Sequence, residues 1–157
     1  MKKVLAIVMI FVMVLSFAAC GGSKEEKTSF DAKKAAEALI GSDEFKGCAI
    51  EDPEQIEFEF NITLEDTEEF YMTRANGLSA NMFIIAVAKE GSGKASLMYG
   101  EMEKIVETYA SSWVDSNYEE RRAEAPKVKG RYESEKDGVY ICIISNDNDA
   151  MVKLIGK

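Results

Sequence analysis

The residues of this chain that could do chemistry are cysteines and carboxylates, because the sequence contains no histidine. That absence excludes Ser-His-Asp triads, zinc sites with histidine ligands and histidine proton shuttles. The cysteines are Cys20, Cys48 and Cys142, and 28 acidic residues outnumber 19 basic ones. The chemistry left open is modification or pairing of a thiol, and acid–base or cation-binding work by carboxylates.

Cys20 follows a segment with the three parts of an export signal. Two lysines lie near the start of the chain, residues 4–17 form an apolar run, and two alanines directly precede Cys20. A positive start, an apolar middle and small residues before a cleavage point are typical of secretory signals. The apolar run is shorter than the roughly 20 residues that a stable membrane span needs.

The string Phe17-Ala18-Ala19-Cys20 resembles the lipobox of bacterial lipoproteins. The resemblance implies that residues 1–19 are a lipoprotein signal peptide, cut before Cys20, and that the Cys20 thiol carries a diacylglyceryl group. Phe17 departs from the leucine that is usual at its position. Two alternatives stay open: an ordinary secretory signal that is cut nearby, and an uncleaved membrane anchor. Two or three acyl chains give stable anchoring, whereas one chain binds reversibly.

Composition predicts where such a protein lies and what it meets. Residues 20–29 are mostly small, polar or charged and predict a lipidated N-terminus with a flexible tether, and residues 30–157 predict one folded domain. We expect this domain at the extracytoplasmic face of the cell membrane, held by membrane lipid through Cys20. The chain's net charge of −9 repels nucleic acid, which is therefore not an expected partner. The expected partner is a protein or a small molecule of unknown identity.

Three segments have the pattern of amphipathic helices. Residues 31–40 are rich in helix formers and precede Gly41, a natural helix end. Residues 149–155 predict a short closing helix, capped by Asp147 or Asn148. The longest helix is expected over residues 95–120, where apolar residues recur at spacings of three and four: Met98, Met102, Ile105, Val106, Tyr109 and Trp113.

Alternation and turn residues predict the strands. Residues 68–73 and 81–89 flank an Asn-Gly turn, and residues 128–134 and 139–145 flank Asp-Gly. The strand at 81–89 is apolar on both faces, so we expect it in the middle of the sheet. Residues 54–62 are ambiguous, because Asp52-Pro53 fits a helix start while the following apolar and acidic residues alternate. We favour a strand there over a helix.

The order of these elements predicts an α+β domain. A mostly antiparallel sheet would carry the long amphipathic helix across one face, with short terminal helices beside it. The layout also resembles an uncharacterised family of small Gram-positive lipoproteins, domain of unknown function 4358. The resemblance rests on the lipobox, the apolar strand at 81–89, the long helix and the late Gly-Val-Tyr-Ile strand at 138–141. It implies a single extracytoplasmic domain and supplies no functional residue.

Residues 47–73 contain many acids but no lysine or arginine. Clustered carboxylates suit calcium or a cationic ligand. We favour a solvated face instead, complemented by basic residues elsewhere, because the acids lack the spacing of a calcium loop. The acids are Glu51, Asp52, Glu54, Glu57, Glu59, Glu65, Asp66, Glu68 and Glu69, and the basic residues are Arg121, Arg122, Lys127, Lys129 and Arg131.

Two further motifs are better explained without a ligand. Residues 146–149 begin like a calcium loop but continue into apolar residues, so turn and cap roles fit better. Residues 91–94 read Gly-Ser-Gly-Lys but lack the first glycine and the Ser or Thr of a phosphate loop, as Ala88 and Ala95 stand there. We therefore predict no metal site, no cofactor and no catalytic residue.

Cys48 and Cys142 are the thiols left once Cys20 is modified. In an oxidising exterior they could form a disulfide, although Cys142 lies in an apolar run where a free thiol behaves as a small hydrophobe. Two inert thiols are favoured over the disulfide and over redox chemistry. Trp113 and Tyr109 could line a pocket, but their helical spacing favours core packing.

These observations predict a membrane-anchored, non-enzymatic binding or structural module. The first alternative is a carboxylate-dependent hydrolase at the cell surface, since acid–base chemistry needs only two suitably spaced carboxylates. Two buried carboxylates with separated pKa values in a cleft would favour that enzyme. The second alternative is an inhibitor of an exported enzyme, which would insert a protruding loop at residues 73–80.

Overall fold

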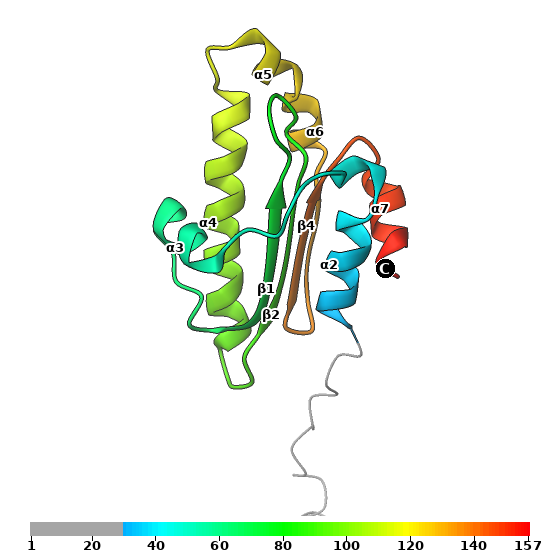
Figure 1. Cartoon of the computed structure of the whole chain (residues 1–157). Helices are drawn as coiled ribbons and strands as arrows, with labels where there is room; N and C mark the ends of the chain where they lie inside the picture. The colour runs from blue at the N-terminus through cyan, green and yellow to red at the C-terminus, as the bar shows by residue number, and fades with distance from the viewer. Residues whose placement is uncertain (1–29) are drawn as a thin grey trace, which may run out of the picture.

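A four-stranded antiparallel sheet lies between two layers of helices in the computed structural model of this chain, which describes residues 30–157 (Figure 1). The strands are β1 (Thr67–Arg74), β2 (Met82–Ala88), β3 (Tyr132–Lys136) and β4 (Val139–Ile144), in the order β1-β2-β4-β3. Both neighbours of β4 run antiparallel to it, so β2 and β3 are parallel with β4 between them. The predicted α+β class with a mostly antiparallel sheet is confirmed.

The long helix α4 (Lys94–Val114) covers one face of the sheet, as predicted. It buries the expected apolar residues and is about 31 Å long at 1.5 Å per residue. It ends before the predicted residue 120, at a polar turn that begins with Asp115. The chain then forms two short helices, α5 (Glu119–Ala123) and α6 (Ala125–Lys129). Val128 thus lies in α6, and β3 begins at Tyr132, later than predicted.

The opposite face is covered by the two ends of the domain. These are α2 (Ala32–Ile40), the 3-10 helix η1 (Asp43–Phe45) and α7 (Asn148–Leu154). Side-chain caps start both α-helices: Asp31 accepts from the Lys34 N–H at 2.9 Å, and Asp147 accepts from the Ala150 N–H at 2.9 Å. The predicted terminal helices and the Asp147 cap are confirmed, and the helices form a second layer.

The central strands β2 and β4 are buried on both sides. Ile84 and Cys142 are paired in the register and belong to the cluster beneath α4, whereas Ile85 and Ile141 are paired and belong to the cluster beneath α2 and α7. Every residue of β4 is buried. The predicted central place of residues 81–89 is confirmed, because a strand between two helical layers has no solvent face for polar residues.

The strand predicted at residues 54–62 is wrong. This segment is helix α3 (Pro53–Phe60), started by the Asp52 side chain, which accepts from the Glu54 N–H at 3.0 Å. Ile56 is buried, but Phe58 is 91% exposed, so the alternating apolar residues do not share one face. The cap and the proline in the first turn outweighed the alternation, because Asp and Pro at these positions favour a helix start.

The predicted signal peptide, Cys20 and tether lie outside the described residues. The described chain begins at Phe30, at the end of the molecule where α2 starts. Among residues 30–157, no helix combines the length and the apolar character needed to cross a membrane.

Candidate functional site

A cleft of about 370 Å³ opens between α4 and the edge strand β3. Four carboxylates line it, two from each element. Val106 lies between the helical pair, and Arg131 precedes the strand. The carboxylates are Glu103, Glu107, Glu133 and Glu135, and we call this site the acidic cleft.

Regular secondary structure positions all four side chains. Glu103 and Glu107 are four residues apart on α4, so they lie on the same side of the helix. Glu133 and Glu135 are two residues apart on β3, so they lie on the same side of the strand. Their register partners in β4 face α4, which turns both strand carboxylates toward the helix.

Glu133 is the carboxylate with the most contacts in the acidic cleft. Arg131 Nε donates to its Oε2 at 3.0 Å, and the Tyr140 hydroxyl donates to its Oε1 at 2.5 Å. Burial is the main reason why the pKa of Tyr140 is raised, and the neighbouring Cys142 and Glu133 add to it. Tyr140 therefore stays a protonated donor beneath the cleft.

The pKa of Glu135 is raised in the acidic cleft. Its pKa is raised by partial burial, and then by the negative charges of Glu103 and Glu133. Such a site favours a positive group that enters it. Among the described residues, no three Asp, Glu or Cys side chains are grouped closely enough to hold a metal ion. The four carboxylates of the cleft can bind the charged end of a flexible side chain or an organic cation.

The sequence contains both glutamate pairs of the acidic cleft, but it does not show that they meet. The spacing of four on a helix and of two on a strand is visible without a structure. Their opposition depends on β3 lying at the edge next to β4, and the strand order was not predictable. Of the charged cleft residues, Arg131 alone has a role predicted from the sequence, as a complement to the acids of residues 47–73, and the structure pairs it with Glu133 instead.

Three of the acids at residues 47–73 form ion pairs, with Arg74 and Lys94. Arg74 donates from Nε to Glu51 at 2.9 Å and from Nη1 to Glu59 at 2.5 Å, and Lys94 pairs with Asp66. The hydrogen bond from Arg74 is the main reason why the pKa of Glu59 is lowered. The remote basic residues proposed as complements do not make these pairs.

Residues 146–149 act as turn and cap residues, as the sequence predicts. The Asn146 amide donates to Glu44 at 2.8 Å, and Asn148 Oδ1 accepts from the Ser145 N–H at 2.9 Å. Glu44 also accepts from Asn81, whose Oδ1 accepts from Lys127 Nζ at 3.2 Å. Lys127, one of the proposed complements, thus belongs to a polar network that joins η1 to α6.

The Gly-Ser-Gly-Lys motif does not form a phosphate loop in the structure. Its lysine, Lys94, extends to Asp66. Residues 91–93 instead line a wide groove of about 2050 Å³ at the end of the domain where Phe30 lies. The lining of this groove mixes both charges with apolar side chains, and Lys157 Nζ lies 4.6 Å from the Phe30 ring.

Cys48 and Cys142 are free thiols. Cys142 belongs to the cluster beneath α4, and Cys48 packs against the cluster beneath α2 and α7, on the other face of the sheet. A disulfide would have to pass through the sheet, so the structure does not support that alternative. Burial raises the pKa of the Cys142 thiol, which keeps it protonated and unreactive.

Tyr109 and Trp113 are core residues, as favoured. Both are buried in the cluster beneath α4, and their ring centroids are 6.0 Å apart. Arg121 covers the Trp113 ring at 4.5 Å. Burial raises the pKa of Tyr109 to about 12. Tyr109 and Trp113 therefore pack in the core and do not line a ligand pocket.

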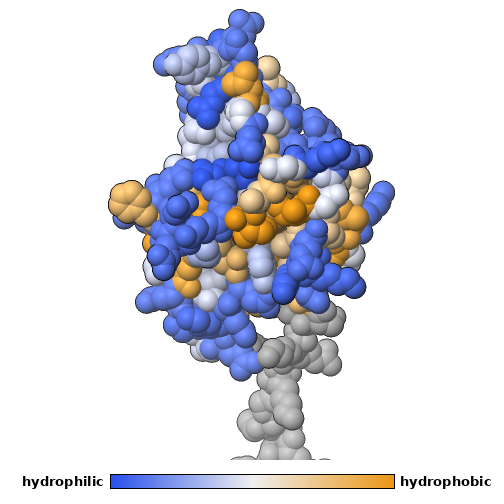
Figure 2. Space-filling model, viewed as in Figure 1, coloured by the Kyte–Doolittle hydropathy of each residue, from blue (hydrophilic) through white to orange (hydrophobic). Residues whose placement is uncertain are grey.

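The loop at residues 75–81 is partly fixed. Ala80 and Asn81 are buried, and the Ala80 N–H donates to Glu124 at 2.9 Å. The exposed hydrophobic side chains, Leu78 among them, are spread over different elements. Figure 2 shows a mostly hydrophilic face with an apolar area near its middle. The acidic cleft, where like charges gather from two elements, is therefore the candidate site we consider further.

No protein-family model, no curated protein and no solved structure matches this chain. The resemblance to domain of unknown function 4358 stays a prediction.

Proposed function

We propose that this chain is a lipid-anchored, extracytoplasmic binding protein without catalytic activity. The observation that carries the proposal is the string Phe17-Ala18-Ala19-Cys20 between an apolar run and a polar segment. Cleavage before Cys20 and lipid on its thiol would leave a short link to a folded domain. Tethering raises the effective concentration of such a domain for partners at the same membrane.

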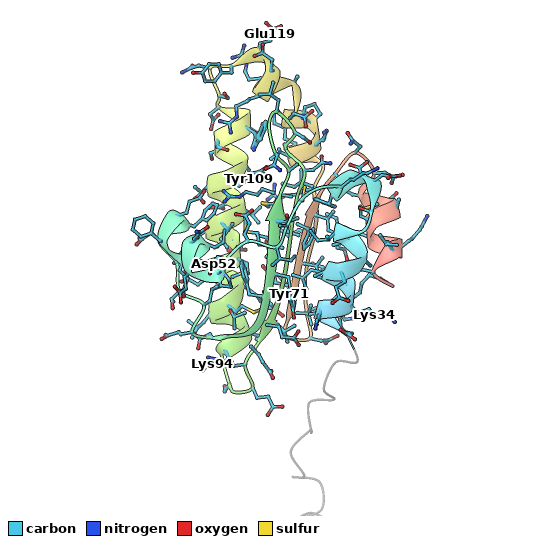
Figure 3. The ribbon with its side chains drawn as sticks, viewed as in Figure 1. Lys34, Asp52, Tyr71, Lys94, Tyr109 and Glu119 are labelled. Carbon is cyan, nitrogen blue, oxygen red and sulfur yellow. The ribbon has the colours of Figure 1, made fainter. Side chains whose placement is uncertain are left out.

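The shape of the domain is compatible with such a tether. Residues 20–29 can span at most about 35 Å when fully extended. Figure 3 places Lys34 and Lys94 near the end where the described chain begins, and Glu119 at the opposite end. The anchored domain would thus keep its base within about 35 Å of the membrane, with the β3 edge of the sheet open to a partner.

The acidic cleft supports binding more than acid–base catalysis. Its four carboxylates are all exposed, and a catalytic pair would need a shielded acid and an ionised partner held against the substrate. The loop considered for an inhibitor is tied to Glu124 and does not stand clear of α5 and α6. Both alternatives therefore rank below the binding module.

Metabolic labelling with an alkyne analogue of palmitate tests the proposal. Cells expressing the full chain should yield a labelled protein, Cys20→Ala should lose the label, and Cys48→Ala should retain it. External protease should digest the domain on intact cells without an outer membrane. Label that persists in Cys20→Ala, or a domain protected from external protease, would contradict the proposal.

A further inference from the structure

The two edges of the sheet differ in how open they are. At the β1 edge, the Glu51 N–H donates to the Met72 carbonyl at 2.9 Å, and the Thr73 hydroxyl donates to the Ala49 carbonyl at 2.7 Å. A crossing segment thus occupies part of that edge. β3 pairs with β4 on one side and is the last strand in the order, so its other side forms an edge.

An edge strand presents backbone N–H and C=O groups to which another strand can pair. Acidic side chains hinder pairing of this edge with a second copy of the same strand, because the like charges would meet. They favour a strand of opposite charge for the same reason. The acidic cleft adjoins this edge on the side of the sheet that faces α4.

Most of the negative charge of the acidic cleft has no cation beside it. Arg131 pairs with Glu133, and no ion pair with a described residue is found for Glu103, Glu107 or Glu135. Burial raises the pKa of Glu135, and the nearby negative charges of Glu103 and Glu133 raise it further. A positive side chain placed between α4 and β3 would relieve this repulsion.

We propose that the β3 edge and the acidic cleft together bind an extended, basic segment of a partner protein as an added strand. This inference rests on the proposed function, because it names the surface and the partner class of the anchored binding module. Main-chain hydrogen bonds to β3 hold the segment, and alternate side chains reach into the cleft.

The side chains of β3 define the pattern that the partner needs. Glu133 and Glu135 face α4, whereas Ser134 and Lys136 lie on the other side of the strand. A bound strand therefore places lysine or arginine at every second position, toward the glutamates. The positions between them are neutral, because Lys136 repels a positive charge.

A peptide of about seven residues that alternates lysine with threonine matches one edge strand. Its binding to the full-length chain in detergent is measured by fluorescence anisotropy. We expect binding that weakens with added salt, and a loss of at least about tenfold in affinity for Glu103→Gln/Glu107→Gln/Glu135→Gln. The matched control Glu54→Gln/Glu119→Gln/Glu120→Gln removes the same charge elsewhere and should change affinity by less than about twofold.

A second peptide separates strand addition from simple charge attraction. The same sequence with N-methyl groups on alternate amides keeps its charge but loses donors for the sheet edge, and one of its two methylation registers should bind at least about tenfold more weakly. An equal loss of peptide affinity in both triple variants, or full affinity of both methylated peptides, would overturn the inference. Detergent-solubilised protein binds independently of its anchor, so a failure here leaves the lipid-labelling result intact.

Discussion

Arg74 connects three parts of the chain through one guanidinium group. It pairs with Glu51 before α3 and with Glu59 within α3, and its guanidinium carbon lies 5.4 Å from the centroid of the Phe60 ring. Both carboxylates come from the acidic stretch, and they compete with desolvation to keep the raised pKa of Arg74. A side chain that is three-quarters buried makes such pairs stronger than a surface ion pair.

We expect Arg74→Ala to lower the free energy of unfolding by about 2 kcal/mol, because two carboxylates lose a bidentate partner. The control is Lys104→Ala, which removes a largely exposed pair with Glu101 and should cost less than about 0.5 kcal/mol. Chemical denaturation monitored by circular dichroism measures both. Equal losses would show that Arg74 acts as an ordinary surface charge.

Glu135 should make the stability of the fold depend on pH. Because its pKa is raised in the folded chain, its protonated form stabilises the fold below the unfolded pKa of about 4.3. That stabilisation is lost as pH rises through the folded pKa. We expect Glu135→Gln to be a few tenths of a kcal/mol more stable than the unmodified chain at neutral pH, an amount kept small by solvent screening.

The stability difference between Glu135→Gln and the unmodified chain should shrink toward acidic pH, where both side chains are neutral. Denaturation curves across this range measure it. Glu120→Gln makes the same charge change on α5, away from the acidic cleft, and should give no comparable gain. A Glu135→Gln variant that is less stable at neutral pH would show that the carboxylate makes a favourable contact.

At the scale of elements, α3 shows how local signals compete. Its Ile, Phe and Phe alternate with glutamates, which is the pattern of a strand, but Asp52 and Pro53 start a helix. On the helix, Ile56 enters the core beneath α4 while Phe58 points into solvent. In a half-buried strand, the two side chains would share one face.

This difference predicts unequal effects of truncation. Ile56→Ala should lower the free energy of unfolding by about 2–4 kcal/mol, because it leaves a cavity in the core. Phe58→Ala should change it by less than about 0.5 kcal/mol. Denaturation of the two variants under the same conditions compares them. Large losses in both would contradict the helix.

The sequence predicted the elements that have a plain hydrophobic pattern. The helix α4 followed from apolar residues at spacings of three and four, and the buried strand β2 followed from a run that is apolar on both faces. The ends of elements were less predictable. A buried valine such as Val128 fits the short helix α6 as well as it would fit the start of a strand. Local pattern cannot give the strand order, which depends on contacts between distant segments.

The acidic cleft was beyond prediction for the same reason. Glu103 and Glu133 are far apart in the sequence, and they meet because the chain crosses from β2 through α4 to the far edge and returns as β4. Each pair alone resembles a solvated face. The thiols show the opposite case, since Cys142 in an apolar run was correctly predicted to be a buried free cysteine.

At the scale of the whole molecule, we propose a membrane anchor that is joined to an acidic domain with two helical layers. The chain's net charge of −9 disfavours binding to anionic surfaces, so the proposed lipid and not surface charge would hold the domain at a membrane. The acidic cleft lies beside the β3 edge of the sheet, where we expect a partner at the same membrane to reach it. This proposal depends above all on lipid at Cys20.

The most direct test is the intact mass of the full-length gene product purified from the membrane fraction, compared with that of Cys20→Ala. We expect a chain that starts at Cys20 and carries an added diacylglyceryl mass, and a variant that lacks this mass. An unmodified chain cut at another position and released from the membrane would contradict the lipid anchor.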